Sequence, residues 1–431
     1  MPLPFNDWLR AGDPSRPLFL KKGGAVTVRM LAAEAARRLA LVERTGWERI
    51  AVQSQGAADF LASFAAILCA GRTPVLPGSR RPDDAALGGS ADAVLGRGPR
   101  GSLPRIDPAD SLAAGLSVLP PVPPEAGFVL YTSGSSGTPK EVRKSVGQMD
   151  REAEITSALF ASRLEGLVFA GTVDPLHMYG LSFLIWLPMA LGLPVLARRL
   201  EVPEDLAGLT FPSALVTTPT FLHYLEPAPE GPDIRFLLTA GGPLSAGDAG
   251  RARSSLGLWA DEIYGSTELG AIASRRSCDS PGLARLLPGI AFADAARAII
   301  STPLVPEGRA QLDDLIEPLG GSSFRLLGRR DQIVKVAEHR VSLGEVERAV
   351  QLDGREVRAL LVVRNGRAAI GLVVSGYPAG PLPGATAAAL RRRLLARLPL
   401  PAVPRFFRGC PRLPRNAQGK VERERLLELF K

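Results

Sequence analysis

The sequence contains little cysteine and no apolar run long enough to cross a bilayer. Its three cysteines, Cys69, Cys278 and Cys410, are odd in number and widely spaced among 431 residues, which fits neither a disulfide framework nor a metal site. The longest apolar segment, 181–196, is broken by two prolines and a glycine, whereas a spanning helix needs about 20 apolar residues. We therefore expect reduced structural thiols, and buried helix and strand instead of a membrane span.

The start of the chain also lacks a leader pattern, because Asp7, Arg10 and Asp13 replace the usual charged segment followed by an apolar one. Internal repeats and low-complexity tracts are absent as well. With 46% hydrophobic and 22% charged residues, these features predict a cytoplasmic globular protein of two or three domains.

The excess of positive charge is confined to the end of the chain. Residues 332–431 hold 19 Lys or Arg and 8 Asp or Glu, a net charge of +11, whereas the first 331 residues hold 33 and 35, a net charge of −2. A solvated Arg-rich surface and a small basic domain that meets an acidic partner are both compatible with this distribution. Aromatic residues do not alternate with the basic ones as in nucleic-acid-binding segments, so we expect no nucleic acid partner.

Short apolar strands alternate with helical segments through most of the chain. Strands are expected at 49–53, 73–76, 127–131, 167–170, 214–217 and 236–239, and a helix at 57–69. This alternation predicts an α/β fold with several helix-covered sheets, in which loops at the carboxyl ends of the strands form the ligand site. The Gly-, Pro- and Ala-rich stretch 88–124 is expected to wrap the surface.

The last hundred residues show a different pattern. Two strand-like runs, 357–363 and 368–374, flank Asn365-Gly366, which is a strong hairpin signal, and a helix is expected at about 385–398. The sequence therefore predicts a large N-terminal domain (1–328), a hinge (329–331) and a small mobile α+β domain (332–431).

A segment rich in glycine and hydroxyl residues follows the strand Phe128–Tyr131 and ends in Thr-Pro-Lys140. Gly134 and Gly137 allow close backbone approach, and the hydroxyl residues are Thr132, Ser133, Ser135, Ser136 and Thr138. Backbone amides and hydroxyls in such a loop cradle phosphate oxygens, and Lys140 adds the compensating charge. In the Walker pattern, by contrast, the lysine directly follows glycine. A flexible linker is the alternative, but linkers rarely follow an apolar strand and end in Thr-Pro-Lys.

With this loop the chain resembles the adenylate-forming superfamily of acyl- and aryl-CoA synthetases, peptide-synthetase adenylation domains and luciferases. Four further motifs in the superfamily's order extend the resemblance from about Tyr131 to Lys420. The segment 240–244, with Gly241, Gly242 and Pro243, resembles the adenine-side loop, and a simple strand-to-helix turn is the alternative. The segment 263–268 resembles the most diagnostic motif, which implies that Tyr264 stacks on adenine, Thr267 contacts the α-phosphate and Glu268 binds Mg²⁺. ATP and Mg²⁺ are therefore the implied cofactors.

Two more motifs lie toward the end of the chain. The resemblance implies that Asp314, fourteen residues before Gly328, accepts hydrogen bonds from the ribose hydroxyls, although the adjacent Asp313 remains an alternative. It also implies that Arg329 supports the ribose and phosphate, that Asp331 is the hinge, and that Lys420 is the catalytic lysine at the reacting α-phosphate.

The segment 175–181 resembles the acyl pocket of the superfamily. It places His177 beside the substrate carboxylate, with Tyr179, Gly180 and Gly265 as further substrate-binding residues. A core histidine without a role in binding is the alternative. In its extended form, through Trp186-Leu-Pro and 192–195, the segment resembles compact ligases of aryl-polyene and xanthomonadin-type pigment pathways, which hand aryl acids to an acyl carrier protein.

The resemblance implies that a carboxylic acid, such as a hydroxybenzoate-like acid, is joined to AMP and then transferred to the phosphopantetheine thiol of an acyl carrier protein. Coenzyme A as the acceptor, and a catalytically silent nucleotide-binding partner, are the alternatives. Glu338 replaces a usual glycine near the thiol tunnel, which leaves the thioester step open. A short N-terminal half and the region 291–312, which lacks the expected glycine-rich strand pair, indicate a trimmed enzyme.

Overall fold

The computed structural model describes residues 1–10, 12–77, 90–97, 103–110, 118–133, 139–226, 231–279, 282–329, 333–336, 339–350, 355–364, 367–415 and 421–431. The chain divides into two compact units. Unit 1 comprises Met1–Pro281, Arg285–Ala293 and Ser301–Ala310, and unit 2 comprises Gly282–Ala284, Asp294–Ile300 and Gln311–Lys431. The hinge expected at 329–331 stays a prediction. The part of the chain described contains no helix that is both long and apolar enough to cross a membrane.

One sheet of unit 1 has the strand order β6-β5-β3-β4-β7-β8. Its strands are β3 (Arg49–Val52), β4 (Thr73–Leu76), β5 (Ala93–Leu95), β6 (Arg105–Ile106), β7 (Gly127–Ser133) and β8 (Pro139–Ser145). The strands from β6 to β7 are parallel, and β8 pairs antiparallel with β7. The prediction that 88–124 wraps the surface is wrong for β5, because its three apolar residues are buried between β3 and β6.

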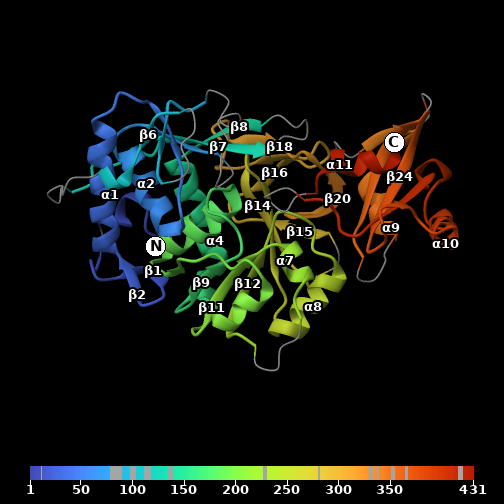
Figure 1. The fold of residues 1–431 in the computed structure, drawn as a ribbon, viewed down its shortest axis with the longest axis horizontal. Helices are drawn as coiled ribbons and strands as arrows, with labels where there is room; N and C mark the ends of the chain where they lie inside the picture. Colours follow the sequence, from blue (N-terminus) through green and yellow to red (C-terminus); the bar gives the residue numbers. More distant parts are fainter. Residues whose placement is uncertain are drawn as a thin grey trace. The chain divides into compact units, whose positions relative to one another are not determined.

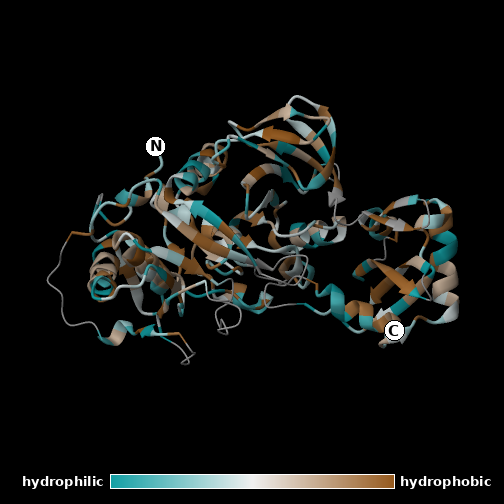
Figure 2. Cartoon of the chain, turned by 90° about the horizontal axis from the view of Figure 1, so that it is seen from above, coloured by the Kyte–Doolittle hydropathy of each residue, from teal (hydrophilic) through white to brown (hydrophobic). Residues whose placement is uncertain are grey.

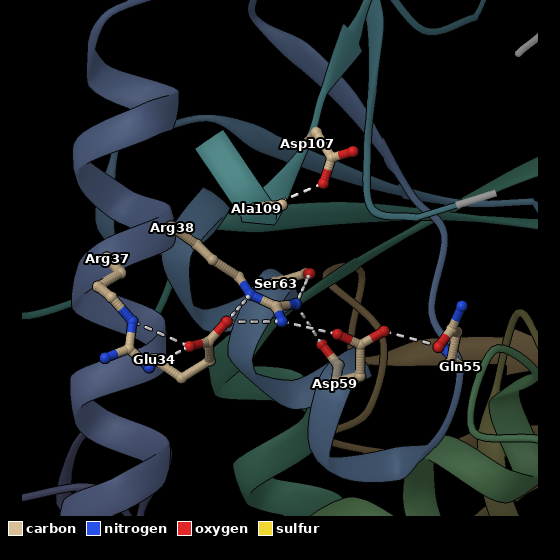
Figure 3. Close-up of polar contacts among 8 residues, drawn as sticks. All are labelled: Glu34, Arg37, Arg38, Gln55, Asp59, Ser63, Asp107 and Ala109. Carbon is tan, nitrogen blue, oxygen red and sulfur yellow. Dashed lines mark hydrogen bonds and ion pairs between the residues drawn. The ribbon is translucent and has the colours of Figure 1, made fainter. Parts of the chain in front are cut away.

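Helix α2 (Ala57–Cys69) packs against this sheet, and α1 (Val28–Glu43) packs against α2 (Figure 1). The buried Arg38 of α1 joins the two helices: its Nη2 donates to Oδ1 of Asp59 over 2.7 Å, and its Nε donates to Oε1 of Glu34 over 2.9 Å (Figure 3). The other oxygen of Asp59 accepts from the backbone amide of Gln55, just before α2. Because its donors have partners, the guanidinium can be buried between the helices.

The second sheet of unit 1 contains the order β14-β13-β12-β11-β9-β10-β1-β2. Its strands are β1 (Pro17–Lys21), β2 (Gly24–Thr27), β9 (Val168–Gly171), β10 (Val195–Leu196), β11 (Ser213–Thr217), β12 (Ile234–Thr239), β13 (Asp261–Ser266) and β14 (Gly270–Arg276), followed by β15 (Leu283–Leu286). The strands from β1 to β13 in this order are parallel. Every residue of β9 and β11 is buried, as expected for parallel strands covered on both faces.

Helices cover these sheets, so the α/β architecture expected from the sequence is confirmed. The helices of unit 1 beyond α2 are α4 (Val146–Leu164), α5 (Met178–Gly180), a π-helical turn (Leu181–Trp186), α6 (Leu187–Leu191), α7 (Pro219–His223) and α8 (Ala246–Leu256). Short 3-10 turns occur at Phe5–Asp7, Pro108–Asp110 and Pro203–Gly208. The apolar segment 181–196 is buried helix and strand, as predicted.

An aromatic cluster fills the core of unit 1 where α2, β7 and the π-helical turn meet. Trp186 stacks on Phe5 and on Phe128, with ring centroids 5.6 and 6.1 Å apart, and Phe64 meets Phe128 edge-on at 5.2 Å. The indole of Trp186 donates to Oδ1 of Asp150 in α4 over 2.9 Å. Large aromatic side chains from four segments thus hold together the helices and strands that carry the candidate site.

Unit 2 contains two hairpins and a four-stranded sheet with helices on both faces. The hairpins are β19 (Asp314–Gly320) with β20 (Ser323–Arg329), and β21 (Ile333–Val336) with β22 (His339–Ser342). The sheet has the order β23-β24-β26-β25, formed by β23 (Val357–Arg364), β24 (Arg367–Ser375), β25 (Gly380–Pro381) and β26 (Phe406–Cys410). The helices are α9 (Leu343–Val350), α10 (Gly384–Leu395) and α11 (Arg423–Leu427), with 3-10 turns at Leu400–Ala402 and Glu428–Phe430.

Alternate residues of β24 face two separate apolar clusters in unit 2. Leu372 packs in one cluster with Val346 of α9 and Leu394 of α10, whereas Val373 packs in the other with Leu426 of α11. In Figure 2 the strands beside the C label are mainly brown, and the helices around them carry teal segments. The strands β16 (Ala291–Asp294), β17 (Ile299–Ser301) and β18 (Arg309–Gln311) occupy the region in which the sequence lacks the expected glycine-rich pair.

Candidate active site

Three of the predicted segments follow the carboxyl ends of neighbouring parallel strands of the second sheet. His177 comes after β9, Gly241–Pro243 come after β12, and the segment 264–268 lies at the end of β13 and just beyond it. In this sheet β9 pairs with β11, β11 with β12, and β12 with β13. Open α/β sheets bind ligands at this edge, so the fold gathers these segments where a ligand site is expected.

The loop after β12 exposes bare backbone. Gly241 has a φ of 87°, in the left-handed region that favours glycine, and nothing lies within 4 Å of the position where a Cβ would stand at Gly241 or Gly242. Pro243 is exposed as well. Such a loop leaves room for a flat ring against the backbone, and the adenine-side role of these residues stays a prediction.

The turn between β13 and β14 carries Thr267 and Glu268. Tyr264 pairs with Ala273 across the two strands. A Cβ at Gly265 would lie 2.1 Å from the carbonyl oxygen of Gly270, so only glycine lets the strands approach here. We infer that Gly265 shapes the turn through this close approach.

Lys140 of β8 and Glu268 of this turn form an ion pair, with Nζ 2.8 Å from Oε1. The two side chains are 62% and 37% exposed, which leaves both open to a ligand. Burial raises the pKa of Glu268, but the hydrogen bond and charge of Lys140 outweigh it, and the pKa lies below its ordinary value. Glu268 is therefore an ionised carboxylate at neutral pH, beside the lysine expected to bind phosphate.

The stem of the phosphate loop is fixed on both sides. The loop residues Gly134 to Thr138 lie outside the described residues, whereas Thr132 pairs with Lys140 in the β7–β8 ladder. The hydroxyl of Tyr131 donates to Oε2 of Glu141 over 3.0 Å, and the same oxygen accepts from Nη2 of Arg49 over 2.7 Å. These contacts hold the start and the end of the loop together.

The candidate acid-binding segment contacts β12. The hydroxyl of Tyr179 donates to the carbonyl oxygen of Leu238 over 3.1 Å, and burial raises the pKa of Tyr179 well above its ordinary value. His177 is half-buried, and its amide donates to the carbonyl oxygen of Asp174. A Cβ at Gly180 would lie 2.1 Å from that same oxygen, so Gly180 is required for the packing of the segment.

The remaining predicted residues belong to unit 2. Asp314 begins β19 and pairs with Arg329 of β20, whereas Asp313 precedes the strand and is exposed. This pairing brings Asp314 and Arg329 onto one hairpin, and the choice between Asp314 and Asp313 as the ribose ligand stays a prediction. Asp331 and Lys420 lie outside the described residues, so their roles stay predictions.

Two charged residues near Glu268 were missed by the sequence reasoning. Lys144 is buried, and its Nζ donates to the backbone carbonyl oxygen of Glu268 over 2.6 Å. Glu152 of α4 is also buried and accepts from the amide of Ala271 over 3.3 Å. One signal was available, because Glu152 interrupts a helix face whose other members, Met149, Ala153 and Thr156, are mainly apolar.

The described residues contain no group of three or more His, Cys, Asp or Glu side chains that could form a metal site of protein ligands alone. Glu268 offers a single partly exposed carboxylate instead. Mg²⁺ is commonly held by one or two carboxylates together with phosphate oxygens and water. The donor set therefore fits a magnesium ion that arrives with a nucleotide.

Comparison with known proteins agrees with this geometry. Residues 95–303 match the model of a family described as AMP-binding enzyme. A 4-coumarate–CoA ligase from Rhodobacter capsulatus is 30% identical over 68% of this chain and 74% of its own length, and one from Cereibacter sphaeroides is 28% identical over 69% and 71%. The isonitrile lipopeptide synthase of Mycobacterium tuberculosis is 28% identical over 91% of this chain. That relative is much longer, and the match covers only 18% of its length.

Solved structures share the fold across the whole chain. The O-succinylbenzoate coenzyme A synthetase from Bacillus subtilis, in complex with ATP and magnesium ion, superposes with a TM-score of 0.80 at 19% identity, covering 97% of this chain and 99% of that one. A benzoate CoA ligase from Burkholderia xenovorans gives 0.81 at 20% identity, covering 98% and 99%. At such low identity these likenesses establish the fold.

Proposed function

The chain belongs to the family of AMP-binding enzymes, and from this membership we propose that it activates an aryl carboxylic acid as its adenylate and passes the acyl group to a carrier-protein thiol. Membership makes it an AMP-forming acid–thiol ligase with ATP and Mg²⁺ as cofactors. We propose the class of acid, the acceptor thiol and the roles of the individual residues.

The first half-reaction exchanges one phosphorus–oxygen bond for another. A carboxylate oxygen of the acid bonds to the α-phosphorus of ATP, the bond from the α-phosphorus to the bridging oxygen breaks, and pyrophosphate leaves with that electron pair. Bound Mg²⁺ would neutralise phosphate charge during this exchange. Lys140 would neutralise the negative charge of the departing pyrophosphate, and Thr267 would contact the α-phosphate. Lys420 would neutralise the charge that develops at the reacting α-phosphate. Glu268 would hold the metal ion.

The observation that carries the proposal is the convergence of Lys140 and Glu268. They are 128 residues apart and come from two different sheets, yet their charged groups lie 2.8 Å apart at the edge where β12 and β13 end. A phosphate-binding cation beside a metal-binding carboxylate is the arrangement that phosphoryl chemistry with Mg²⁺ requires. The presence of both groups counts against the alternative of a catalytically silent nucleotide-binding partner.

An aryl acid is favoured by the names of the relatives. Three relatives bear the name 4-coumarate–CoA ligase, and a benzoate CoA ligase shares the fold. His177 would lie beside the carboxylate, while Tyr179 is tied to β12 by its hydroxyl. A panel of hydroxybenzoic, cinnamic and fatty acids tests this choice, because an aryl pocket should accept the first two classes and discriminate against the third.

An acyl carrier protein is favoured as the acceptor by the charge of the C-terminal hundred residues. Their net charge is +11, and Arg391, Arg392 and Arg393 of α10 are all exposed. Exposed positive charge accelerates encounter with an acidic partner and makes it sensitive to salt. Coenzyme A is the competing acceptor. Parallel assays with coenzyme A and with a phosphopantetheinylated carrier protein separate the two, since the proposal expects faster transfer to the carrier, and slower transfer at high salt.

The catalytic role of Lys420 is tested by Lys420→Ala, with Lys431→Ala as the control because Lys431 is exposed at the end of the chain. Acid-dependent pyrophosphate exchange into ATP should disappear in Lys420→Ala while calorimetric binding of ATP persists. The control should retain both. Full exchange activity in Lys420→Ala would remove that residue from the mechanism.

A further inference from the structure

Two lysines on one face of strand β8 contact the same residue. Lys140 and Lys144 are four residues apart, so alternation places both on one face of the strand. Lys140 contacts the carboxylate of Glu268, whereas Lys144 donates from Nζ to its backbone carbonyl oxygen over 2.6 Å. Lys140 is 62% exposed and can contact a ligand. Lys144 is only 3% exposed, so it can affect the site only through its contacts within the protein.

A second buried ionisable side chain, Glu152 of α4, contacts β14 just after the same turn. It is 4% exposed, and its Oε1 accepts from the amide of Ala271 over 3.3 Å. A Cβ at Gly270 would lie 2.6 Å from Oε2 of Glu152, and Gly270 has a φ of 78°. The carboxylate therefore packs against a piece of backbone that only glycine can provide. The backbone around Glu268 is therefore held by two hydrogen bonds, one at the carbonyl oxygen of residue 268 and one at the amide of residue 271.

Both charges pay a desolvation penalty that apolar residues at these positions would avoid. Burial lowers the pKa of Lys144 and raises the pKa of Glu152, and the attraction between the two groups opposes both shifts. Buried apolar residues, including Val142 on β8 and Met149 on α4, lie on the same two elements as these side chains. Buried charges that donate to and accept from one backbone turn are suited to fixing its conformation.

We propose that Lys144 and Glu152 are positioning residues, which fix the backbone of the turn 267–271 so that the Glu268 carboxylate is held ready for the metal ion of the nucleotide. This inference rests on the proposed function, because that function gives Glu268 its metal. Partners that orient a metal ligand commonly change metal affinity by about 10- to 100-fold when they are removed. A purely structural role would instead reduce stability and leave the magnesium dependence unchanged.

The test compares Lys144→Met and Glu152→Gln with two neighbours that lack these contacts. Arg143→Met alters a 75% exposed side chain on the other face of β8, and Glu154→Gln alters an exposed residue of α4. Calorimetry gives the affinity for ATP with Mg²⁺ and with a chelator, and hydrogen exchange by mass spectrometry reports on the peptide containing 266–271. The Mg²⁺ concentration for half-maximal pyrophosphate exchange provides the kinetic measure.

For Lys144→Met we expect the half-maximal Mg²⁺ concentration to rise about tenfold, with unchanged ATP affinity in chelator and faster hydrogen exchange in the turn. Glu152→Gln should show the same direction with a smaller change, because its amide oxygen can still accept from Ala271. Both controls should behave as wild type. If Lys144→Met does not fold, the double variant Lys144→Met/Glu152→Gln removes both buried charges together and should show the same rise in the half-maximal Mg²⁺ concentration.

The failure of the inference is distinct from the failure of the function. A folded Lys144→Met or double variant with wild-type magnesium affinity and wild-type protection of the turn overturns the positioning role, even if the enzyme is fully active. A wild-type protein without pyrophosphate exchange on any acid overturns the proposed function instead, and the calorimetric and hydrogen-exchange measurements then still decide the role of Lys144 and Glu152.

Discussion

The ammonium group of Lys140 lies 2.8 Å from Oε1 of Glu268, although the two residues are 128 positions apart in the sequence. Lys140 ends the phosphate-loop motif and Glu268 ends the most diagnostic motif of the family. Their contact joins the six-stranded sheet to the turn after β13 and marks the place where phosphate and metal are expected to meet.

Glu268→Gln should lower acid-dependent pyrophosphate exchange on the order of 100-fold, because a neutral amide cannot supply the charge that a divalent cation requires. Binding of ATP in a chelator should change little. Glu154→Gln is the matched control, since Glu154 is exposed and pairs with Arg151 one helical turn away. Equal exchange rates in wild type and Glu268→Gln would rule out Glu268 as the metal ligand.

Lys140→Met should weaken the binding of ATP and of pyrophosphate by about 10- to 100-fold, the range expected for losing a hydrogen bond to a charged group. The loss should fall on the phosphates, so adenosine should bind equally well to the variant and to wild type. Arg143→Met controls for the loss of a positive charge on the same strand, because the Arg143 side chain is 75% exposed. Equal losses in the two variants would point to a general effect of charge.

Arg49→Met should destabilise the protein by about 1 kcal/mol at neutral pH, because Arg49 and Glu141 form a 2.7 Å ion pair that is about 30% exposed. Hydrogen bonding by Arg49 is the main reason that the pKa of Glu141 lies below its ordinary value of 4.5. A lowered pKa stabilises the folded state above the ordinary value, and the stabilisation is lost as pH falls through the folded-state pKa.

The difference in unfolding free energy between wild type and Arg49→Met should therefore be full at pH 7 and shrink below about pH 4.5. Denaturant unfolding at several pH values measures it. Arg151→Met removes a more exposed pair and should change stability by less than about 0.5 kcal/mol at any pH. A constant difference for Arg49→Met from pH 7 to pH 3 would contradict the ion-pair explanation.

Gly265→Ala should destabilise the protein by about 1–3 kcal/mol and impair exchange, because its Cβ would collide with the carbonyl oxygen of Gly270. Backbone atoms cannot rotate away as a flexible side chain can. Gly250→Ala lies in helix α8 with open space around the new Cβ, so it should be neutral or stabilising by up to about 1 kcal/mol. Thermal or denaturant unfolding distinguishes the two, and a neutral Gly265→Ala would show that β13 and β14 can separate at this point.

The sequence allowed accurate prediction where the signal is local. Helix α2 occupies 57–69 and β4 occupies 73–76, as expected, because an apolar run is bounded by glycine at both ends of the helix. The order of the motifs along the chain indicates the family without knowledge of any contact between distant residues. The place of the candidate ligand-binding segments after β9, β12 and β13 could also be predicted, because ligand loops lie at the carboxyl ends of parallel strands.

Contacts between distant segments could not be predicted in this way. Strand β8 has the sequence Pro139 to Ser145, with four charged residues, and it is a strand because it pairs with β7, not because of its own hydrophobicity. The same pairing turns Lys144 inward toward Glu268, 124 residues away. Glu152 left a local signal, a carboxylate on a buried helix face, but its partner Ala271 in β14 is set by tertiary packing.

The most direct test of the central claim is pyrophosphate exchange into ATP, measured with purified protein in the presence and absence of hydroxybenzoic, cinnamic and fatty acids. The account predicts exchange that requires both Mg²⁺ and an added acid, is greatest with the aryl acids, and disappears in Lys420→Ala. A wild-type protein that binds ATP yet shows no exchange with any acid of the panel would contradict acyl-adenylate formation.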